Sequence, residues 1–281
     1  MADNILKENL LKRIGILFNP NISAARDFTA EIAKLLPSLG VSCWQCSTHD
    51  EDKIRSQVKG TDLVLSVGGD GTVLRAARAV SPFSIPVVGV NLGKLGFLTE
   101  LKVAEARDRI PALLRGEGWI DERAMLKVEL GGNEPLHALN DIFVGRGAAP
   151  RVVNVGVVID GIPFTTYKAD GVIVATATGS TGYSLADGGP ILYPQAKEIV
   201  LNPICPHPTF NNSLVLSSKT IVELKVRTDN QAVLSVDGQV NIALEGEQTI
   251  KVSISPHVAR FLRLQPPTVF YSTLVERLVP K

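Results

Sequence analysis

The sequence has little cysteine, little excess charge of either sign and no long apolar run. Three cysteines among 281 residues cannot build a disulfide framework, which fits a reducing compartment. A formal net charge of +1 gives no electrostatic reason to expect nucleic acid or an anionic membrane as a partner. No apolar stretch is long enough to span a bilayer, and the N-terminal residues lack the apolar core of a secretory signal. These absences predict a cytoplasmic protein.

The composition is typical of a soluble globular protein, with 45% hydrophobic and 20% charged residues. A chain of this length can form one large domain or two of ordinary size. Cys43 and Cys46 have a spacing that suggests metal or redox chemistry. Both fall in an expected strand, where positions three apart point to opposite faces, and no second pair completes a zinc set. We interpret them as ordinary buried cysteines.

The first part of the chain alternates short apolar runs with amphipathic segments. Apolar runs that end in turn residues predict strands, and apolar positions three and four apart predict helices. The expected strands are 13–18, 41–46, 63–67 and 85–90, and the expected helices are 23–36, 50–58, one that starts behind residue 72, and 103–116, in which Pro111 allows a kink. This alternation predicts an α/β domain with a parallel sheet flanked by helices.

From Arg123 onward the pattern changes to runs rich in Val, Ile and Thr. Asp-Gly pairs at 160–161, 170–171 and 237–238 interrupt these runs and predict hairpin turns or bulges. The second half is therefore expected to be mainly antiparallel β, and residues 268–278 are again helical in pattern. The expected division is an α/β domain over 1–118, a β-rich domain over 119–266, and a C-terminal helix over 267–281 that packs back on the first domain.

The most informative stretch is Gly-Gly-Asp-Gly-Thr at 68–72, between an apolar run and a helix. Glycines let the backbone approach a ligand and a helix start offers unpaired N–H groups, so this turn can cradle phosphates. Asp70 would repel phosphates unless it binds Mg²⁺, accepts a proton or hydrogen-bonds a hydroxyl, as in a kinase site. The alternative is that Asp70 caps the helix and the glycines only permit the bend. Asn19 and Asn91 also follow expected strands, which places them at the same sheet edge.

Residues 68–72 match, in this strand–helix context, a phosphate-binding signature shared by NAD kinases, diacylglycerol-type lipid kinases and, with serine last, 6-phosphofructokinases. The stretch 91–98, Asn-Leu-Gly-Lys-Leu-Gly-Phe-Leu, closely resembles an element of NAD kinases that the other two groups do not share. Taken without the resemblance, Lys94 would be a solvated lysine in a turn. The resemblance therefore narrows to the NAD kinase family.

Two later stretches resemble the same family. Residues 138–141 resemble its Asn-Asp motif, whose side chains hold the bound NAD, and residues 169–190 resemble its long glycine-rich motif. The chain has Ala177 where a proline is usual and Gly182 where an alanine is usual. Both differences remove bulk or constraint without adding charge, so they bear on local rigidity more than on the ligand.

The polar residues of these stretches suit a nucleoside. Asn140 can present an amide donor and acceptor, and Asp141 can accept hydrogen bonds from a ribose diol. Thr178, Ser180, Thr181 and Tyr183 suit a hydrogen-bonding and stacking pocket for adenine and ribose. The alternatives are an ordinary turn into a strand for the Asn-Asp pair and a polar surface loop for the hydroxyls. By resemblance Asp170 lies near the nicotinamide end of NAD, although a turn residue is an equal alternative.

The resemblance implies an enzyme that moves the terminal phosphoryl of ATP, or of polyphosphate, to the adenosine ribose 2′-hydroxyl of NAD. Asp70 is the expected catalytic residue, as a base or as an organiser of the hydroxyl or of Mg²⁺ or another divalent cation. The donor phosphates are expected at Gly68, Gly69, Gly71, Thr72 and Asn19. The NAD site is expected at Asp70, Gly71, Asn140, Asp141, Lys168, Asp170, Thr181, Gly182, Tyr183 and Ser184.

The expected partners are NAD, the phosphoryl donor and further copies of the chain, as a homodimer or homotetramer assembled through the β domain. His207 is left outside the catalytic set, because phosphoryl transfer needs little acid–base chemistry and a lone histidine is more often structural. One alternative is a lipid or sugar kinase that uses the same glycine turn. Another is a nucleotide-sensing protein without turnover, for which a carboxylate beside phosphates would have no use.

Overall fold

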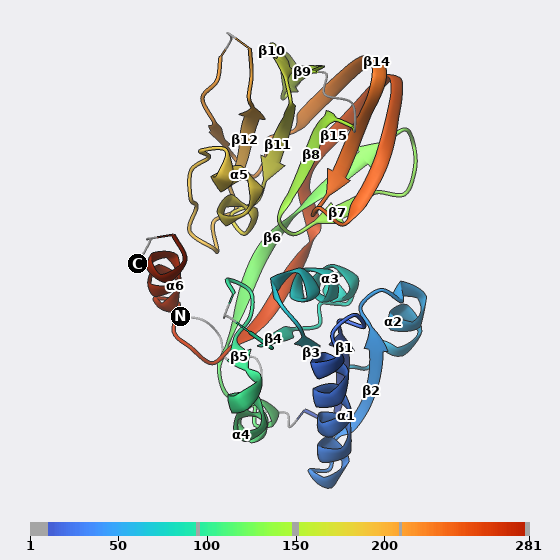
Figure 1. The fold of residues 1–281 in the computed structure, drawn as a ribbon, viewed down its shortest axis with the longest axis vertical. Coiled ribbons are helices and arrows are strands. Elements are labelled where there is room, and N and C mark those ends of the chain that lie inside the picture. Colours follow the sequence, from blue (N-terminus) through green and yellow to red (C-terminus); the bar gives the residue numbers. More distant parts are fainter. Residues whose placement is uncertain (1–10, 94–95, 148–151, 208–209, 279–281) are drawn as a thin grey trace. The chain divides into compact units, whose positions relative to one another are not determined.

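The computed structural model describes residues 11–93, 96–147, 152–207 and 210–278, with the backbone alone at 228–231. The chain forms two compact units. The first holds the described residues up to Glu122 and those from Ala259 onward, and the second spans Arg123–Val258. The chain enters the second unit within β6 (Trp119–Leu130) and leaves it within β15 (Val240–Arg263), as Figure 1 shows.

The first unit is built on the predicted parallel sheet, in the strand order β2-β1-β3-β4. Its strands are β1 (Arg13–Phe18), β2 (Ser42–Ser47), β3 (Leu63–Val67), β4 (Val87–Asn91) and the short β5 (Leu101–Lys102), which lies parallel to β4. β4 begins two residues later than predicted because Pro86 has no N–H for the ladder. The Pro86 carbonyl still accepts a hydrogen bond from the Val64 N–H (2.9 Å).

Helices cover both faces of this sheet. They are α1 (Ser23–Ser38), α2 (Glu51–Gln57), α3 (Asp70–Val80), the 3-10 turn η1 (Ser81–Phe83) and α4 (Val103–Leu114), which continues past Pro111. The C-terminal helix α6 (Val269–Leu278) has no buried residue and contacts the loop after β4, where the Phe270 and Phe97 ring centroids are 6.3 Å apart. Phe28 of α1 and Ile110 of α4 share one core with Val88 of β4. Gly89 points to the other face, where a methyl group in its place would lie 2.8 Å from Val73 of α3. No helix of the described ranges is long and apolar enough to cross a membrane.

The second unit is mainly antiparallel β, as predicted. Strands pair in the order β13-β12-β11-β8-β14-β15, with β9 between β14 and β10 and with β7 on β6. Their bounds are β7 (Leu136–Ala138), β8 (Asp141–Arg146), β9 (Val153–Ile159), β10 (Ile162–Ala169), β11 (Gly171–Ala175), β12 (Ile199–Ile204), β13 (Leu214–Leu216) and β14 (Val222–Val236). Two short helical turns, η2 (Gly179–Thr181) and α5 (Tyr183–Ala186), follow β11. The core is rich in Val, Leu and Ile from alternate strand positions.

Two of the three predicted Asp-Gly turns are hairpins. Both residues have positive φ at 160–161 (49° and 81°), which form a two-residue turn, and at 237–238 (55° and 63°), which begin a three-residue loop over 237–239. The prediction is wrong for the third pair, because β10 pairs with β9 whereas β11 pairs with β8 and β12. Asp170 lies between these strands: its carbonyl accepts from the Arg146 N–H (2.9 Å) and its N–H donates to the Ile204 carbonyl (3.0 Å).

Candidate functional site

The glycine turn of the first unit connects β3 to α3 and leaves backbone accessible. Gly68 has φ 156°, and a methyl group there would collide with the Thr72 side chain, so this position requires glycine. Thr72 is buried and packs beneath the turn. At Gly69 and Gly71, by contrast, an added methyl group would meet no described atom within 4 Å. The backbone can therefore be approached closely at the start of a helix, where the N–H groups are oriented for an anion.

Asp70 is the first residue of α3, yet it does not cap that helix, so the capping alternative is wrong. Its carboxylate accepts three hydrogen bonds from a distant loop, from the N–H groups of Phe97 (2.8 Å), Leu98 (3.2 Å) and Thr99 (3.3 Å). A methyl group at Gly96 would collide with this carboxylate. The loop over 96–99 thus encloses Asp70 on one side and fixes where its oxygens lie.

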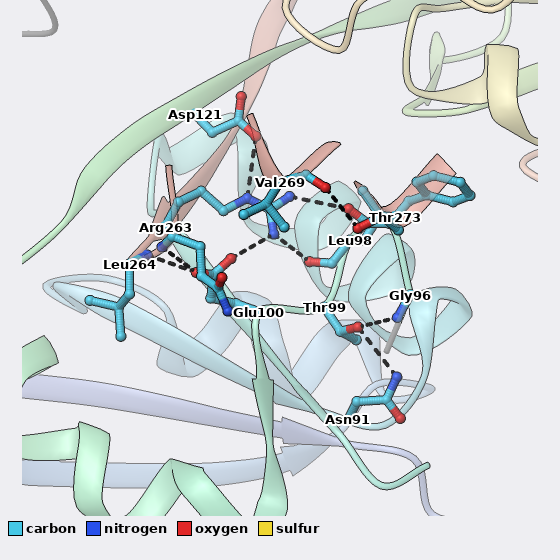
Figure 2. Close-up of polar contacts among 12 residues, drawn as sticks. Asn91, Gly96, Leu98, Thr99, Glu100, Asp121, Arg263, Leu264, Val269 and Thr273 are labelled. Carbon is cyan, nitrogen blue, oxygen red and sulfur yellow. Dashed lines mark hydrogen bonds and ion pairs between the residues drawn. The ribbon is translucent and has the colours of Figure 1, made fainter. Parts of the chain in front are cut away.

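Asn91 and Thr99 organise the same loop, as Figure 2 shows for their side chains and Gly96. The Asn91 Oδ1 accepts from the Gly93 N–H (2.6 Å), and its Nδ2 donates to the Thr99 Oγ1 (3.3 Å). The Thr99 Oγ1 also accepts from the Gly96 N–H (2.7 Å). Asn91 therefore shapes the loop that holds Asp70. Lys94 lies outside the described residues.

The strand ends of the first unit bring three predicted segments together. The Asn19 N–H donates to the Val67 carbonyl (3.2 Å), and the Gly68 N–H donates to the Val90 carbonyl (2.9 Å). The Asn19 Oδ1 accepts from the Asn21 N–H (3.0 Å) and closes a small turn after β1. The expected donor residues thus share one edge of the parallel sheet, where strand ends bind ligands in such folds.

In the second unit, Asp237 holds the Asn-Asp motif in place. Its carboxylate accepts from three consecutive N–H groups, those of Leu139 (3.0 Å), Asn140 (2.8 Å) and Asp141 (3.3 Å). Its own N–H donates to the Asp141 carbonyl (2.9 Å). The sequence identified Asp237 only as a turn residue, because nothing local to it indicates a contact almost a hundred residues away.

The long glycine-rich loop is fastened to the same motif. The Thr176 hydroxyl donates to the Leu139 carbonyl (2.6 Å), and the Thr176 N–H donates to the Asn140 carbonyl (2.8 Å). A methyl group at Gly179 would collide with the Asn140 backbone, so only glycine allows this approach. Thr181 and Gly182 follow directly, and the loop and the Asn-Asp motif form one rigid element.

The hydroxyl groups expected to line a pocket are largely used within this loop. Ser180 donates to the Ala177 carbonyl (2.6 Å) and accepts from the Leu192 N–H (3.0 Å). Thr181 donates to the Thr178 carbonyl (3.1 Å). Ser184 is the exception, because its hydroxyl is fully buried and has no hydrogen-bond partner among the described residues. Tyr183 differs, because its ring is about half exposed and packs at 5.7 Å from the Phe143 ring. Stacking is therefore available here more readily than hydroxyl hydrogen bonds.

Asp141 has an unusual charge environment. Burial, and then the neighbouring Asp237 carboxylate, raise the pKa of Asp141 from its ordinary value of 3.8 to about 7. At neutral pH this carboxyl therefore exchanges between its protonated and ionised forms. Such a group can donate to one ligand oxygen or accept from another.

The two remaining predicted residues lie near the end of β10. Lys168 has an exposed side chain, and its carbonyl accepts from the His207 N–H (2.9 Å). The Asp170 carboxylate forms an ion pair with the Arg146 Nε (3.0 Å), a partner that the sequence did not identify. Cys46 is buried as expected, but Cys43 is only half-buried, because its strand position faces the edge of the helix layer.

Family models match both parts of the chain. The ATP-NAD kinase N-terminal domain matches residues 6–118, and the ATP-NAD kinase C-terminal domain matches residues 139–264. Among curated relatives, a NAD kinase of Dehalococcoides mccartyi is 44% identical over 274 residues, covering 96% of this chain and 96% of the relative. A NAD kinase of Chloroflexus aurantiacus is 42% identical, covering 96% and 99%.

Solved structures of the same family have the same fold. A yeast NADH kinase complexed with NADH gives a TM-score of 0.83 at 27% identity, covering 96% of this chain and 88% of the other. An NAD kinase from Archaeoglobus fulgidus in complex with ATP gives 0.73 at 25% identity, covering 93% and 98%. The lipid- or sugar-kinase alternative is therefore wrong. With the glycine turn, the Asn-Asp motif and the long glycine-rich loop all in place, the chain belongs to the NAD kinase family, whose members phosphorylate NAD.

Proposed function

We propose that Gly68–Thr72 bind the donor phosphates and that Asp70 receives the ribose 2′-hydroxyl of NAD. The observation that carries this proposal is the position of the glycine turn at the start of α3 and next to a fixed carboxylate, with space beside the Cα atoms of Gly69 and Gly71. Helix N–H groups stabilise negative charge that spreads over the transferred phosphoryl. Asn19, at the neighbouring strand end, is proposed as a further donor contact.

The role of Asp70 follows from the lone pairs that remain on its carboxylate. An ionised carboxylate offers about four acceptor positions, and three N–H groups of the loop already donate to this one. A further hydrogen bond from a hydroxyl would orient that hydroxyl for in-line attack and accept its proton as the phosphoryl transfers. Asp70 would thus act on a positioned nucleophile.

NAD is proposed to bind through the Asn-Asp motif and the loop fastened to it. Asn140 and Asp141 would hold the adenosine ribose, and the half-exposed ring of Tyr183 would stack on a base. Gly71, Thr181, Gly182 and Ser184 are proposed to contact NAD mainly through their backbone. Lys168 and Asp170 would contact the nicotinamide end. The rigid attachment of the motif to Asp237 supports this assignment, since a rigid site orients a ribose with little loss of entropy.

A divalent cation such as Mg²⁺ is expected to enter with the donor. Among the described residues, no group of three or more His, Cys, Asp or Glu side chains is placed to hold a metal. Asp70, the natural candidate, already accepts from three N–H donors and has about one acceptor position left, so it could supply a single ligand at most. The protein residues therefore do not fit a metal cage of their own. We assign the cation to the donor phosphates and assign no step to it.

The cell compartment and the assembly are proposed together. The three cysteines are free, as a reducing cytoplasm would keep them. For the assembly, we propose a homodimer or homotetramer through the second unit. Ile162 of the β9–β10 hairpin is 71% exposed, and the Phe164 and Phe210 rings contact each other at 5.3 Å while both are exposed. Light scattering after gel filtration measures the mass, and a monomer at micromolar concentration would contradict the proposed assembly.

One assay tests the proposed chemistry. NADP formation is measured from NAD with ATP, then with polyphosphate, each with and without Mg²⁺, and NADH is tested as a second acceptor. We expect NADP with at least one donor and only in the presence of the cation. Tight NAD binding without NADP formation under all conditions would instead favour a sensing protein.

A further inference from the structure

Arg263, the last residue of β15, is buried in the first unit among charged side chains. It is 7% exposed and lies between Glu100 (6%) and Asp121 (2%), as Figure 2 shows. Its Nε donates to the Asp121 Oδ2 (3.3 Å), and its Nη1 donates to the Glu100 Oε2 (3.2 Å). Burial of these charged groups costs desolvation free energy, and a cluster kept at this cost can serve to fix the geometry of the backbone around it.

The guanidinium also donates to two backbone carbonyls of the loop that encloses Asp70. Its Nη1 donates to the Leu98 carbonyl (3.0 Å), and its Nη2 lies 3.5 Å from the Phe97 carbonyl. The N–H groups of the same two peptide units are those of Leu98 and Thr99, and both donate to Asp70. In a trans peptide the carbonyl and the N–H point in opposite directions. Arg263 and Asp70 therefore hold the same two peptide groups from opposite sides.

The other contacts of this cluster fix the arginine to its strand end. The Glu100 Oε1 accepts from the N–H groups of Leu264 and Gln265, both at 2.8 Å, while its Oε2 binds the guanidinium. A planar fork is needed to reach two carbonyls and two carboxylates at once, and lysine, with one compact charged group, cannot do so. Hydrogen bonds at both ends of a peptide group also polarise and strengthen each other.

We propose that Arg263 is a positioning residue for phosphoryl transfer, because it fixes the peptide groups 97–98 and 98–99 that orient the Asp70 carboxylate. The inference rests on the proposed function, in which Asp70 receives the acceptor hydroxyl. Arg263 itself need not touch either substrate. Its effect on turnover passes through Asp70, and this dependence distinguishes it from a residue that only stabilises the fold.

The test is a double-variant cycle. Arg263→Lys is made alone and together with Asp70→Asn, and kcat, both KM values and the melting temperature are measured. We expect Arg263→Lys alone to lower kcat by roughly 10- to 100-fold, as a misplaced catalytic group does, with both KM values within about twofold. In the Asp70→Asn background the same substitution should change kcat by less than about threefold, since no carboxylate remains to be oriented.

A matched control lies three residues earlier on the same strand. Arg260 pairs with Glu122 (3.0 Å) at the surface and donates to the Ser84 carbonyl, so Arg260→Lys should leave kcat unchanged. If Arg263→Lys does not fold, Glu100→Gln is a second variant that perturbs the same cluster. It weakens the hold on the guanidinium, and it should lower kcat in the parent but not in Asp70→Asn.

The outcomes that would contradict the role of Asp70 differ from those that would contradict only the role of Arg263. Near-parental turnover of Asp70→Asn by itself contradicts the role given to Asp70 in the proposed function, and the inference with it. A large effect of Asp70→Asn, combined with an equal factor for Arg263→Lys in both backgrounds, overturns only the positioning role. An equal loss in Arg260→Lys would do the same, because it would show a general sensitivity of this strand.

Discussion

At the scale of single residues, replacing Asp70 with asparagine removes a negative charge but keeps the size and reach of the side chain. We expect Asp70→Asn to lower kcat by roughly two to four orders of magnitude, the usual contribution of a positioned acid–base group. NAD should still bind, because the other proposed ribose contacts, Asn140 and Asp141, are unchanged. The measurements are NADP formation and NAD titration by calorimetry.

Asp62 provides a control for this variant. Its carboxylate also accepts two backbone hydrogen bonds, from Lys12 (2.7 Å) and Arg13 (2.8 Å), but it precedes β3 while the glycine turn follows that strand. Asp62→Asn therefore removes the charge of a carboxylate that also accepts backbone hydrogen bonds, and it should keep parental turnover. If both variants lost turnover equally, the effect of Asp70→Asn would reflect folding and not chemistry.

The raised pKa of Asp141 predicts how stability changes with pH. Its folded pKa of about 7 exceeds the ordinary value of 3.8, so the folded protein binds more protons between these values. The contribution of Asp141 to the free energy of unfolding is therefore largest below pH 4 and falls as the pH rises to about 7. Asp141→Asn removes this titration, so the variant should gain relative to the parent between pH 5 and 8, by a few kcal/mol at most (about 1.4 kcal/mol per pKa unit).

Urea unfolding at pH 5 and pH 8 measures this difference. A constant gap between the parent and Asp141→Asn across this range would show that Asp141 is ionised throughout.

At the scale of elements, alanine substitutions at two glycines of the long loop are expected to have different effects on the KM for NAD. A methyl group at Gly179 would collide with the Asn140 backbone, whereas one at Gly182 would lie 3.2 Å from the Gly179 carbonyl oxygen and needs only a small shift. Gly179→Ala should raise the KM for NAD by roughly tenfold or more, because it displaces the Asn-Asp motif. Gly182→Ala should leave the KM for NAD within about twofold. Equal effects would mean that the loop does not position this motif.

The elements themselves were well predicted from the sequence, and the contacts between them were not. The apolar runs and the Asp-Gly pairs are local signals, and they located the strands of the sheet around β3 and the hairpins at 160–161 and 237–238. The hairpin prediction fails at 170–171 because an Asp-Gly pair also fits a connection between two strands that do not pair with each other, here β10 and β11.

The same limit applies to the site. Asp70, Asn140 and Gly179 stand in motifs that can be identified by resemblance. Asp237 and Arg263 act on segments about one hundred and more residues away, through backbone groups that every residue possesses. Such partners leave no local pattern, because the contact depends on the fold and not on the neighbours in sequence. A contact between a charged side chain and backbone groups of a distant segment is visible only in the folded structure.

At the scale of the whole molecule, the proposed substrate contacts divide between the two units, except that Asp70 and Gly71 of the first unit are proposed to contact NAD as well. The residues proposed for the donor belong to the first unit, and Asn140 with its loop belongs to the second. Each unit has its own core, so a change in the site of one should leave the packing of the other intact. Substitutions in the two halves should therefore act on different substrates.

Gly69→Ala and Asn140→Ala test this division. The methyl group at Gly69 meets no described atom within 4 Å, and φ there is −85°, so the variant should fold normally while the methyl occupies the space proposed for donor phosphates. We expect it to raise the KM for the donor severalfold and to leave that for NAD unchanged. Asn140→Ala should do the reverse, since losing one or two hydrogen bonds to a ribose costs about 1 to 3 kcal/mol of NAD affinity. Steady-state kinetics with each substrate varied in turn separate the two. The double variant should show the product of the two single effects, because each substitution acts on a different substrate. A rise in both constants from either single substitution would show that the donor and NAD share these contacts, and the assignment of Gly69 to the donor and of Asn140 to NAD would then be wrong.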